Sequence, residues 1–363
     1  MRWIVPALLT LALAGCAPPA RVPAAPTAGT AIPPATPPAA AQATPAETPL
    51  VAQPRPADLA AGLPDYRPDP GFPAQARLTS IGSDSMDPLM QLWLDDFKNL
   101  HPGFEYTLVS KGSATAPRAL VAGTTIMGQM SREMNAQELA SFTARFGYPP
   151  TRVVVAMDAL AVYVNANNPI TQLGLEQVDA IFAKAPRGGF GHPVETWGEL
   201  GLGQEWSTRA IQPYGRDENS GTRAFFQERV LKGGEYKDKV KTEFDQFALV
   251  EAAAMDASGI CYGPIQHQVR MVKAVPIVDF HASTAILPTV ENILDGRYPL
   301  ARFLYIYLNL RPGQALDPAH REFLRFILSR QGQSDVAHFG AIPLPADLAA
   351  INLGKLGPLP NRP

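Results

Sequence analysis

Hydrophobic residues follow two alternating spacings along the chain from residue 77 onward. Short β-type runs, such as 77–81 (RLTSI), end at glycine or at polar turns. Longer runs, such as 90–100 (MQLWLDDFKNL), carry apolar residues at the three- and four-residue spacing of a helix. The expected strands are 77–81, 106–109, 152–165, 209–214, 260–262 and 302–308, and the expected helices are 90–100, 114–122, 134–146, 175–182, 222–231 and 320–330. This alternation predicts an α/β fold with a mostly parallel sheet.

The first 16 residues have the pattern of an export leader. Arg2 precedes an apolar run, 4–13, that is too short to span a bilayer. The leader ends in Leu-Ala-Gly-Cys (13–16), which is similar to the lipobox of bacterial lipoproteins. We therefore expect a signal peptide over 1–16 and a lipid on Cys16; an ordinary secretory peptide with a chance cysteine is the alternative. The residue after the cysteine is Ala17 rather than the aspartate that signals retention at the inner membrane, so the sequence leaves open which membrane holds the protein.

A proline-rich segment follows the leader. Of the chain's 37 prolines, 17 lie in residues 1–73, so the excess belongs to this first part. Residues 17–73 are rich in alanine, proline and threonine, and such a composition buries too little apolar area to offset the entropy of ordering. Proline also keeps a chain extended. We expect 17–73 to be a disordered tether between a membrane surface and the folded part.

Length, charge and composition exclude several classes of protein. A chain of 363 residues suggests two domains, and a net charge of −2 provides no basic field for nucleic acid. No stretch after residue 20 has 18 consecutive apolar residues, which argues against a polytopic membrane protein. Two cysteines cannot make a disulfide framework or a four-cysteine zinc site, and the histidines lack metal-ligand spacing. Cys261 lies in an apolar run and is expected to be a buried, inert thiol.

Three turns share one chemistry, because each follows a β-type run and opens a helical run. They are 82–88 (GSDSMDP), 111–115 (KGSAT) and 216–222 (RDENSGT). Glycine allows a ligand to approach the backbone, and serine or threonine caps the helix and supplies a hydroxyl. Free N–H groups at helix starts carry partial positive charge and together make an anion site. Arg216 adds a guanidinium that binds two oxygens at once.

The order of these blocks resembles the PstS-type phosphate-binding proteins of bacterial phosphate ABC importers, a class of two-domain periplasmic binding protein. The resemblance covers residues 78–344, approximately, and its strongest motif is Arg216-x-x-x-Ser220-Gly221-Thr222. The other blocks that carry it are 82–86 (GSDSM), 112–113 (GS), 128–132 (GQMSR), 158–162 (DALAV) with Asn165, and 259–263 (GICYG).

The resemblance implies a set of phosphate contacts. They would come from the hydroxyl of Ser85, the N–H of Met86, the hydroxyl and amide of Ser113, the guanidinium of Arg216, and donors on Ser220, Gly221 and Thr222. It also implies a type II two-lobe fold, each lobe a mostly parallel sheet flanked by helices. Lobe one is expected at 74–158 and 285–350 and lobe two at 159–284, with hinges at 158–165 and 277–289 and a tail at 351–363.

One position departs from the family pattern. Family members usually place an aspartate just before the segment that begins here at Gly128, and this acid accepts a hydrogen bond from protonated phosphate and repels sulfate. Residues 124–127 (TTIM) contain no acid. Either phosphate binds with weaker rejection of sulfate, or the ligand is another oxyanion. Arg132 is a possible further cation, and Asp84, Asp87 and Asp217 are possible substitute acceptors that the sequence cannot place.

The expected function is an extracytoplasmic, lipid-anchored solute-binding protein, in the periplasm or on the cell surface. It would capture inorganic phosphate, or a similar oxyanion, between its lobes for an ABC permease. No catalytic residue, cofactor or metal is expected. The alternatives are a stand-alone phosphate scavenger, sensor or scaffold without a permease and, with less support, a phosphatase-like enzyme, for which a nucleophile with an adjacent base or a metal cluster is lacking in the sequence.

Overall fold

The computed structural model describes residues 59–357. The expected signal peptide, the lipidated Cys16, residues 17–58 of the expected tether and the end of the tail lie outside the described residues. Within 59–357, no helix is long and apolar enough to cross a membrane.

Nine strands of the described region join into one continuous sheet, in the order β2-β1-β3-β12-β4-β8-β6-β7, with β9 also pairing with β4. Its strands are β1 (Ala76–Gly82), β2 (Phe104–Ser110), β3 (Met127–Met130), β4 (Thr151–Asn165), β6 (Gln212–Arg216), β7 (Lys241–Glu243), β8 (Gly259–Pro264), β9 (Val272–Val275) and β12 (Ala301–Leu308). A small sheet contains β5 (Leu173–Gly174), β10 (Ile277–Val278) and β11 (Ala285–Ile286). The expected parallel pairs occur at each end of the large sheet, between β1, β2 and β3 and between β6, β7 and β8. The long central strands β4 and β12 pair antiparallel with their neighbours, so the sheet is mixed.

Helices follow most of the strands, as the alternation predicts. They are α2 (Asp87–Leu100), α3 (Thr115–Ala122), α4 (Ala136–Phe146), α5 (Leu175–Phe182), α6 (Gly221–Arg229), α7 (Gln246–Met255), α8 (Val290–Leu294), α9 (Pro318–Ile327), α10 (Arg330–Phe339) and α11 (Ala346–Gly354). In α2 the residues at helical spacing, among them Trp93 and Phe97, are fully buried. The expected helix 320–330 ends early, because the Ser329 side chain accepts from the N–H of Gly332 and begins α10.

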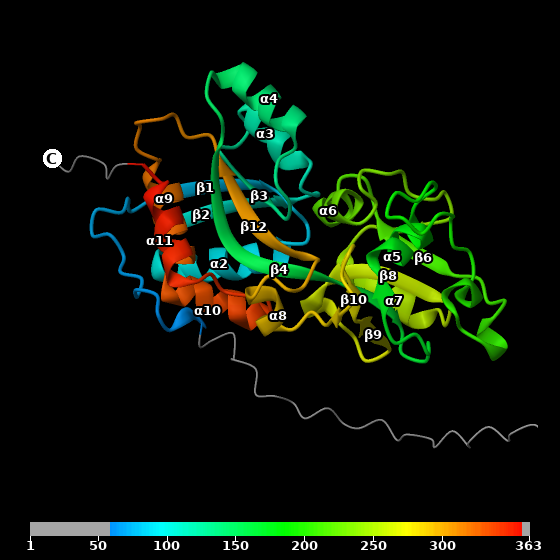
Figure 1. The fold of residues 1–363 in the computed structure, drawn as a ribbon. Helices are drawn as coiled ribbons and strands as arrows, with labels where there is room; N and C mark the ends of the chain where they lie inside the picture. The colour runs from blue at the N-terminus through cyan, green and yellow to red at the C-terminus, as the bar shows by residue number, and fades with distance from the viewer. Residues whose placement is uncertain (1–58, 358–363) are drawn as a thin grey trace, which may run out of the picture. The chain divides into compact units, whose positions relative to one another are not determined.

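The strand β4 passes through both hydrophobic cores. Its first part, up to Ala159, pairs with β12, and residues 160–164 pair with β8. Side chains 153–156 pack in a first core with α2 and α9, whereas Ala159 and Leu160 pack in a second core with α5 and α6. Figure 1 shows β4 (green) and β12 (orange) side by side along this passage. We call the elements around the first core lobe one and the elements around the second core, and the smaller cluster beneath α7, lobe two.

The chain returns to the first core within β12. Ile293, Tyr298 and Leu300 are buried in the second core, and the first core takes over at Leu304. The sequence placed this return at about residue 285, but an apolar pattern does not reveal which of two cores a segment joins.

The end of the expected tether is part of the folded chain. Ala60, Leu63 and Tyr66 are buried in the first core. The hydroxyl of Tyr66 donates to Glu322 of α9 at 2.8 Å and lies 2.7 Å from Nε2 of His101. The extension of the tether to residue 73 is therefore wrong, because Ala60, Leu63 and Tyr66 are buried although the residues between them are exposed.

Candidate functional site

Serine and threonine hydroxyls from four separate segments meet between the two lobes. Ser83 and Ser85 lie between β1 and α2, Ser113 precedes α3, and Ser131 follows β3. Thr222 lies in the first turn of α6, on lobe two. All five side chains are at most 5% exposed. The chain thus brings together the turns that the sequence singled out, with one addition, Ser131.

Ser131 is the centre of this hydroxyl cluster. Its Oγ accepts from Ser83 at 3.2 Å and lies 3.1 Å from Oγ of Ser85 and 3.2 Å from Oγ of Ser113. Ser85 in turn lies 3.3 Å from Oγ1 of Thr222. Ser131 lies in the block 128–132, but no contact with the ligand was expected of it from the sequence. A signal for it was available, because Ser131 directly follows the buried strand β3, as Ser83 directly follows β1.

The start of α6 comes close to this cluster. Ser220 caps the helix, since its side chain accepts from the N–H of Arg223. A Cβ on Gly221 would clash with the hydroxyl oxygens of both Ser113 and Ser131. Glycine is therefore required here for packing, and the helix start, with its N–H groups that have no partner within the helix, lies against the hydroxyls.

Arg216 is buried at the end of β6 and forms an ion pair with Asp84 of lobe one. Its Nε and Nη2 donate to the carbonyl oxygens of Glu243 and Phe244 at 3.1 and 2.6 Å. Two atoms of the pair are buried without a partner, Nη1 of Arg216 and Oδ1 of Asp84. The ion pair thus retains one unused donor and one unused acceptor, and each costs free energy until a ligand or water satisfies it.

Further contacts join the lobes beside the cluster. Gly112 has φ +96°, and a Cβ there would collide with the backbone of Asn219. The carbonyl oxygen of Asn219 accepts from the N–H of Ala114 at 3.2 Å, and its side chain accepts from Arg118 at 3.0 Å. The turn before α3 and the turn before α6 therefore touch directly.

Two of the expected site residues have other contacts. Met86 has its side chain in the first core, so only its backbone is available to a ligand. Arg132 donates to both carboxylate oxygens of Glu138 at 2.7 Å and to the carbonyl oxygen of Glu133. Glu138 also forms the capping box of α4 with Asn135, so Arg132 is held against the start of that helix.

A second buried arginine lies next to the hydroxyl cluster, and the sequence pattern did not predict it as a site residue. Arg302 of β12 donates through Nη1 to Oγ1 of Thr222 at 3.1 Å. Its Nε and Nη2 donate to Oδ2 of Asp158 at 3.1 and 2.8 Å. Arg302 belongs to an otherwise apolar run, where its charge was the available signal.

A cavity of about 780 Å³ opens beside the ion pair of Arg216 and Asp84. It is also lined by Asp87, Lys111 and Phe244. Asp84 and Asp217 both contact Arg216, and Asp84 is the more buried of the two, with 17% of its side chain exposed against 39%.

The described residues contain no group of three or more histidine, cysteine or acidic side chains that would hold a metal ion. Cys261 is fully buried in β8, and burial raises the pKa of its thiol. A thiol in this environment is a poor nucleophile.

Comparisons with known proteins identify the family of this chain. A family model described as a PBP superfamily domain matches residues 39–331. The phosphate-binding protein PstS of Pseudomonas aeruginosa is 39% identical over 295 residues, covering 81% of this chain and 91% of the relative. Protein SphX of Synechococcus elongatus is 26% identical, over 75% of this chain and 79% of its own length.

Solved structures show the same fold. A putative phosphate ABC transporter substrate-binding protein from Clostridium perfringens, solved with bound phosphate, has a TM-score of 0.61 at 23% identity, over 74% of this chain and 99% of its own. An ABC-type phosphate transport receptor from Vibrio cholerae has a TM-score of 0.59 at 21% identity, over 74% of this chain and 100% of its own. The chain belongs to the PstS family of phosphate-binding proteins, within the PBP superfamily.

Proposed function

We propose that this protein binds inorganic phosphate between its two lobes and delivers it to an ABC permease. The observation that carries the proposal is the meeting of the hydroxyl cluster, the start of α6 and the ion pair of Arg216 at one place. These groups come from both lobes, so a ligand held by them would favour the closed arrangement.

The donor set suits a tetrahedral oxyanion. The hydroxyls of the cluster now contact one another at 3.1–3.3 Å, and a ligand would replace these contacts with hydrogen bonds to its oxygens. The N–H groups at the start of α6 add neutral donors, and the unused Nη1 of Arg216 adds a charged one. The site residues expected from the sequence, Ser85, Ser113, Arg216, Ser220, Gly221 and Thr222, and the N–H of Met86, all belong to this proposal.

Asp84 supports phosphate over sulfate. Its Oδ1 is a buried acceptor without a partner, beside a guanidinium with an unused donor. Hydrogen phosphate donates and accepts, so it satisfies both atoms, whereas ionised sulfate only accepts and brings an oxygen against the carboxylate. We propose Asp84 as the acceptor that the missing family aspartate would otherwise provide.

Location and partners complete the proposal. The leader, the lipobox-like Leu-Ala-Gly-Cys and the proline-rich segment support an extracytoplasmic protein held to a membrane through a lipid on Cys16. Several curated relatives are named as phosphate-binding proteins PstS, and solved neighbours are described as parts of phosphate ABC transporters. These descriptions support a permease as partner.

Thermal denaturation of the full-length protein, first freed of carried-over ligand, tests the binding. Phosphate is expected to raise the unfolding free energy in proportion to ln(1 + [L]/Kd), by about 2.7 kcal/mol at a hundredfold excess over Kd. Arg216→Lys should remove most of this shift, because lysine lacks the fork of donors. Arg297→Lys, on the surface of lobe two with half its side chain exposed, is the matched control and should keep the full shift.

Parallel titrations with sulfate and molybdate test the choice of anion. We expect the intact protein to bind phosphate more tightly than sulfate. Asp84→Asn is expected to lower the ratio of phosphate affinity to sulfate affinity. Absence of a shift with phosphate, sulfate and molybdate would overturn the binding function, and a sulfate preference in the intact protein would overturn the role of Asp84.

A further inference from the structure

Arg302 and Asp158 face each other on the two strands that pass from one lobe to the other. They are register partners in the β12–β4 pair. On β4, Asp158 separates residues of the first core from residues of the second, and on β12 Arg302 precedes the return to the first core. Both side chains are 2% exposed. Burying an ion pair costs desolvation free energy, so a contribution to stability alone does not explain this pair, and a role in function is worth testing.

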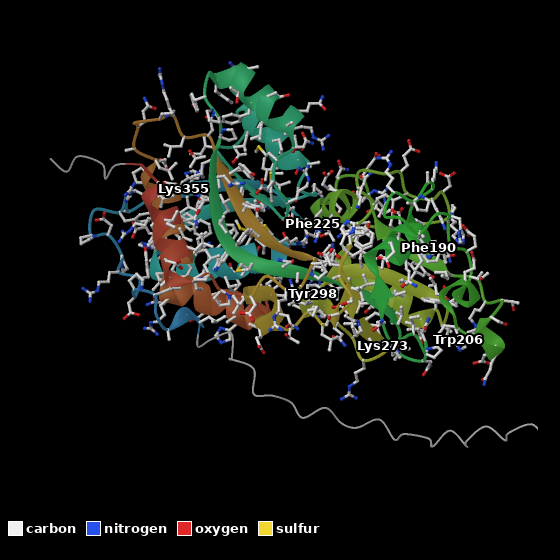
Figure 2. The ribbon with its side chains drawn as sticks, in the orientation of Figure 1. Phe190, Trp206, Phe225, Lys273, Tyr298 and Lys355 are labelled. Atoms are coloured by element: carbon white, nitrogen blue, oxygen red, sulfur yellow. The ribbon has the colours of Figure 1, made fainter. Side chains whose placement is uncertain are left out.

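Each guanidinium nitrogen of Arg302 and each carboxylate oxygen of Asp158 has a hydrogen-bond partner. Oδ2 of Asp158 accepts from Nε and Nη2 of Arg302, and its Oδ1 accepts from the N–H of Ala159 at 2.7 Å. The ring of Phe225, a residue of α6 labelled in Figure 2, has its centroid 5.7 Å from the guanidinium carbon. The guanidinium is therefore fixed in orientation, and its Nη1 is left to reach Thr222.

This third contact excludes one direction for the proton of Thr222. An arginine only donates, so the Thr222 hydroxyl must accept from Nη1. The hydroxyl keeps one proton of its own, and its other close neighbour is Ser85 at 3.3 Å, in the hydroxyl cluster. Because Nη1 of Arg302 occupies an acceptor site of this hydroxyl, the proton of Thr222 is free to point toward the place where the anion would bind.

We propose that Arg302 is a positioning residue for anion binding, held by Asp158, which makes Thr222 a donor to the ligand and ties the crossing strands to the start of α6. The inference rests on the proposed function, since it concerns the same site. It differs from a direct role of Arg302 as a cation for the anion, because Arg302 acts through the Thr222 hydroxyl.

A double-mutant cycle measured by calorimetric phosphate titration separates these roles. Thr222→Val removes the hydroxyl and keeps the shape, and it is expected to weaken phosphate binding about tenfold, the value of one oriented hydrogen bond. Arg302→Lys keeps the charge and an ion pair with Asp158, but one ammonium nitrogen replaces the separate guanidinium nitrogens that contact Asp158 and Thr222, so the Thr222 contact is lost and a loss of affinity of similar size is expected. In the Thr222→Val background, Arg302→Lys should cost almost nothing further.

Two more variants keep the test interpretable. Asp158→Asn with Arg302→Met removes the buried charges together, which avoids leaving one of them unpaired, and should give the same tenfold loss. Arg325→Met breaks the ion pair with Glu322 in lobe one and should leave phosphate affinity unchanged.

The outcomes separate the inference from the proposed function. If the unaltered protein fails to bind phosphate, the proposed function fails and the inference with it. If it binds but Arg302→Lys retains full affinity, the charge alone suffices and the positioning role is wrong. Additive losses in the cycle, near a hundredfold for the double variant, would also overturn it, since they would show that Arg302 acts independently of Thr222.

Discussion

Gly221 shows at the residue scale how a motif acquires its meaning. In the sequence its role was a flexible turn and a close backbone approach to a ligand. In the folded chain its α-carbon lies against the hydroxyls of Ser113 and Ser131, which come from lobe one. A side chain at 221 would therefore hold the lobes apart and displace the donors at the same time.

Gly221→Ala is expected to weaken phosphate binding by more than tenfold, because the added methyl group would occupy space beside the two serine hydroxyls. Titration calorimetry measures the change. Gly354→Ala is the matched control, since this glycine is also helical and a Cβ there meets no atom within 4 Å. Equal affinities for both variants would show that the hydroxyl cluster is not where the anion binds.

At the scale of elements, α10 contains a buried acid that no site uses. Asp335 is 8% exposed, and its Oδ2 has no hydrogen-bond partner. Burial, and secondly the charge of Asp96, raise the pKa of Asp335 to about 7. An unfolded aspartate has a pKa of about 3.9. Between these values the unfolded chain has lost the proton that the folded chain keeps, so stability falls as pH rises from about 4 to about 7.

Asp335→Asn should remove this loss. We expect it to raise the unfolding free energy by about 1–3 kcal/mol at pH 8 and to have little effect near pH 4. Urea denaturation at the two pH values measures the difference. Asp347→Asn, at an exposed position of α11, should show no such gain. An equal effect of Asp335→Asn at both pH values would contradict the raised pKa.

At the scale of the whole described chain, segments far apart in sequence complete lobe one. The stretch that begins at residue 60 packs on α2 and α9, where the ring of Tyr66 meets that of Phe326 edge to face, 5.3 Å between centroids. Tyr66 also bonds to Glu322, which is 3% exposed. The composition of residues 17–73 predicted a tether throughout, whereas the contacts of Tyr66 with Phe326 and Glu322 make the last part of this segment belong to lobe one.

Tyr66→Ala is expected to lower the unfolding free energy by about 3 kcal/mol, through a lost aromatic contact and a buried carboxylate with one partner fewer. Chemical denaturation provides the measurement, with Ile351→Ala as a control because that side chain is 60% exposed. A change below about 1 kcal/mol would mean that residues 59–73 add little to the fold.

The sequence by itself determined the alternation of strands and helices and the three turns that supply most of the candidate site, although it did not predict β3, α7 or α10. A small-residue turn between a strand and a helix is a local pattern, so Ser85, Ser113 and the run from Arg216 to Thr222 were recognisable from their neighbours alone. Of the serines expected to cap these helices, Ser220 does so with its side chain, whereas α2 and α3 begin without a side-chain cap. Family resemblance supplied the two lobes and the ligand class. The lipid anchor and the permease stay proposals from the leader and the relatives.

Only the tertiary structure decided which polar residues face one another. Ser131, Asp84 and Arg302 join the site from separate strands or loops, and nothing local in the sequence pairs Arg302 with Asp158, 144 positions away, or with Thr222, 80 positions away. The same holds for core membership, because an apolar residue such as Tyr298 fits either core by its pattern. Periodicity fixes the face that a side chain occupies, whereas long-range packing chooses its partner.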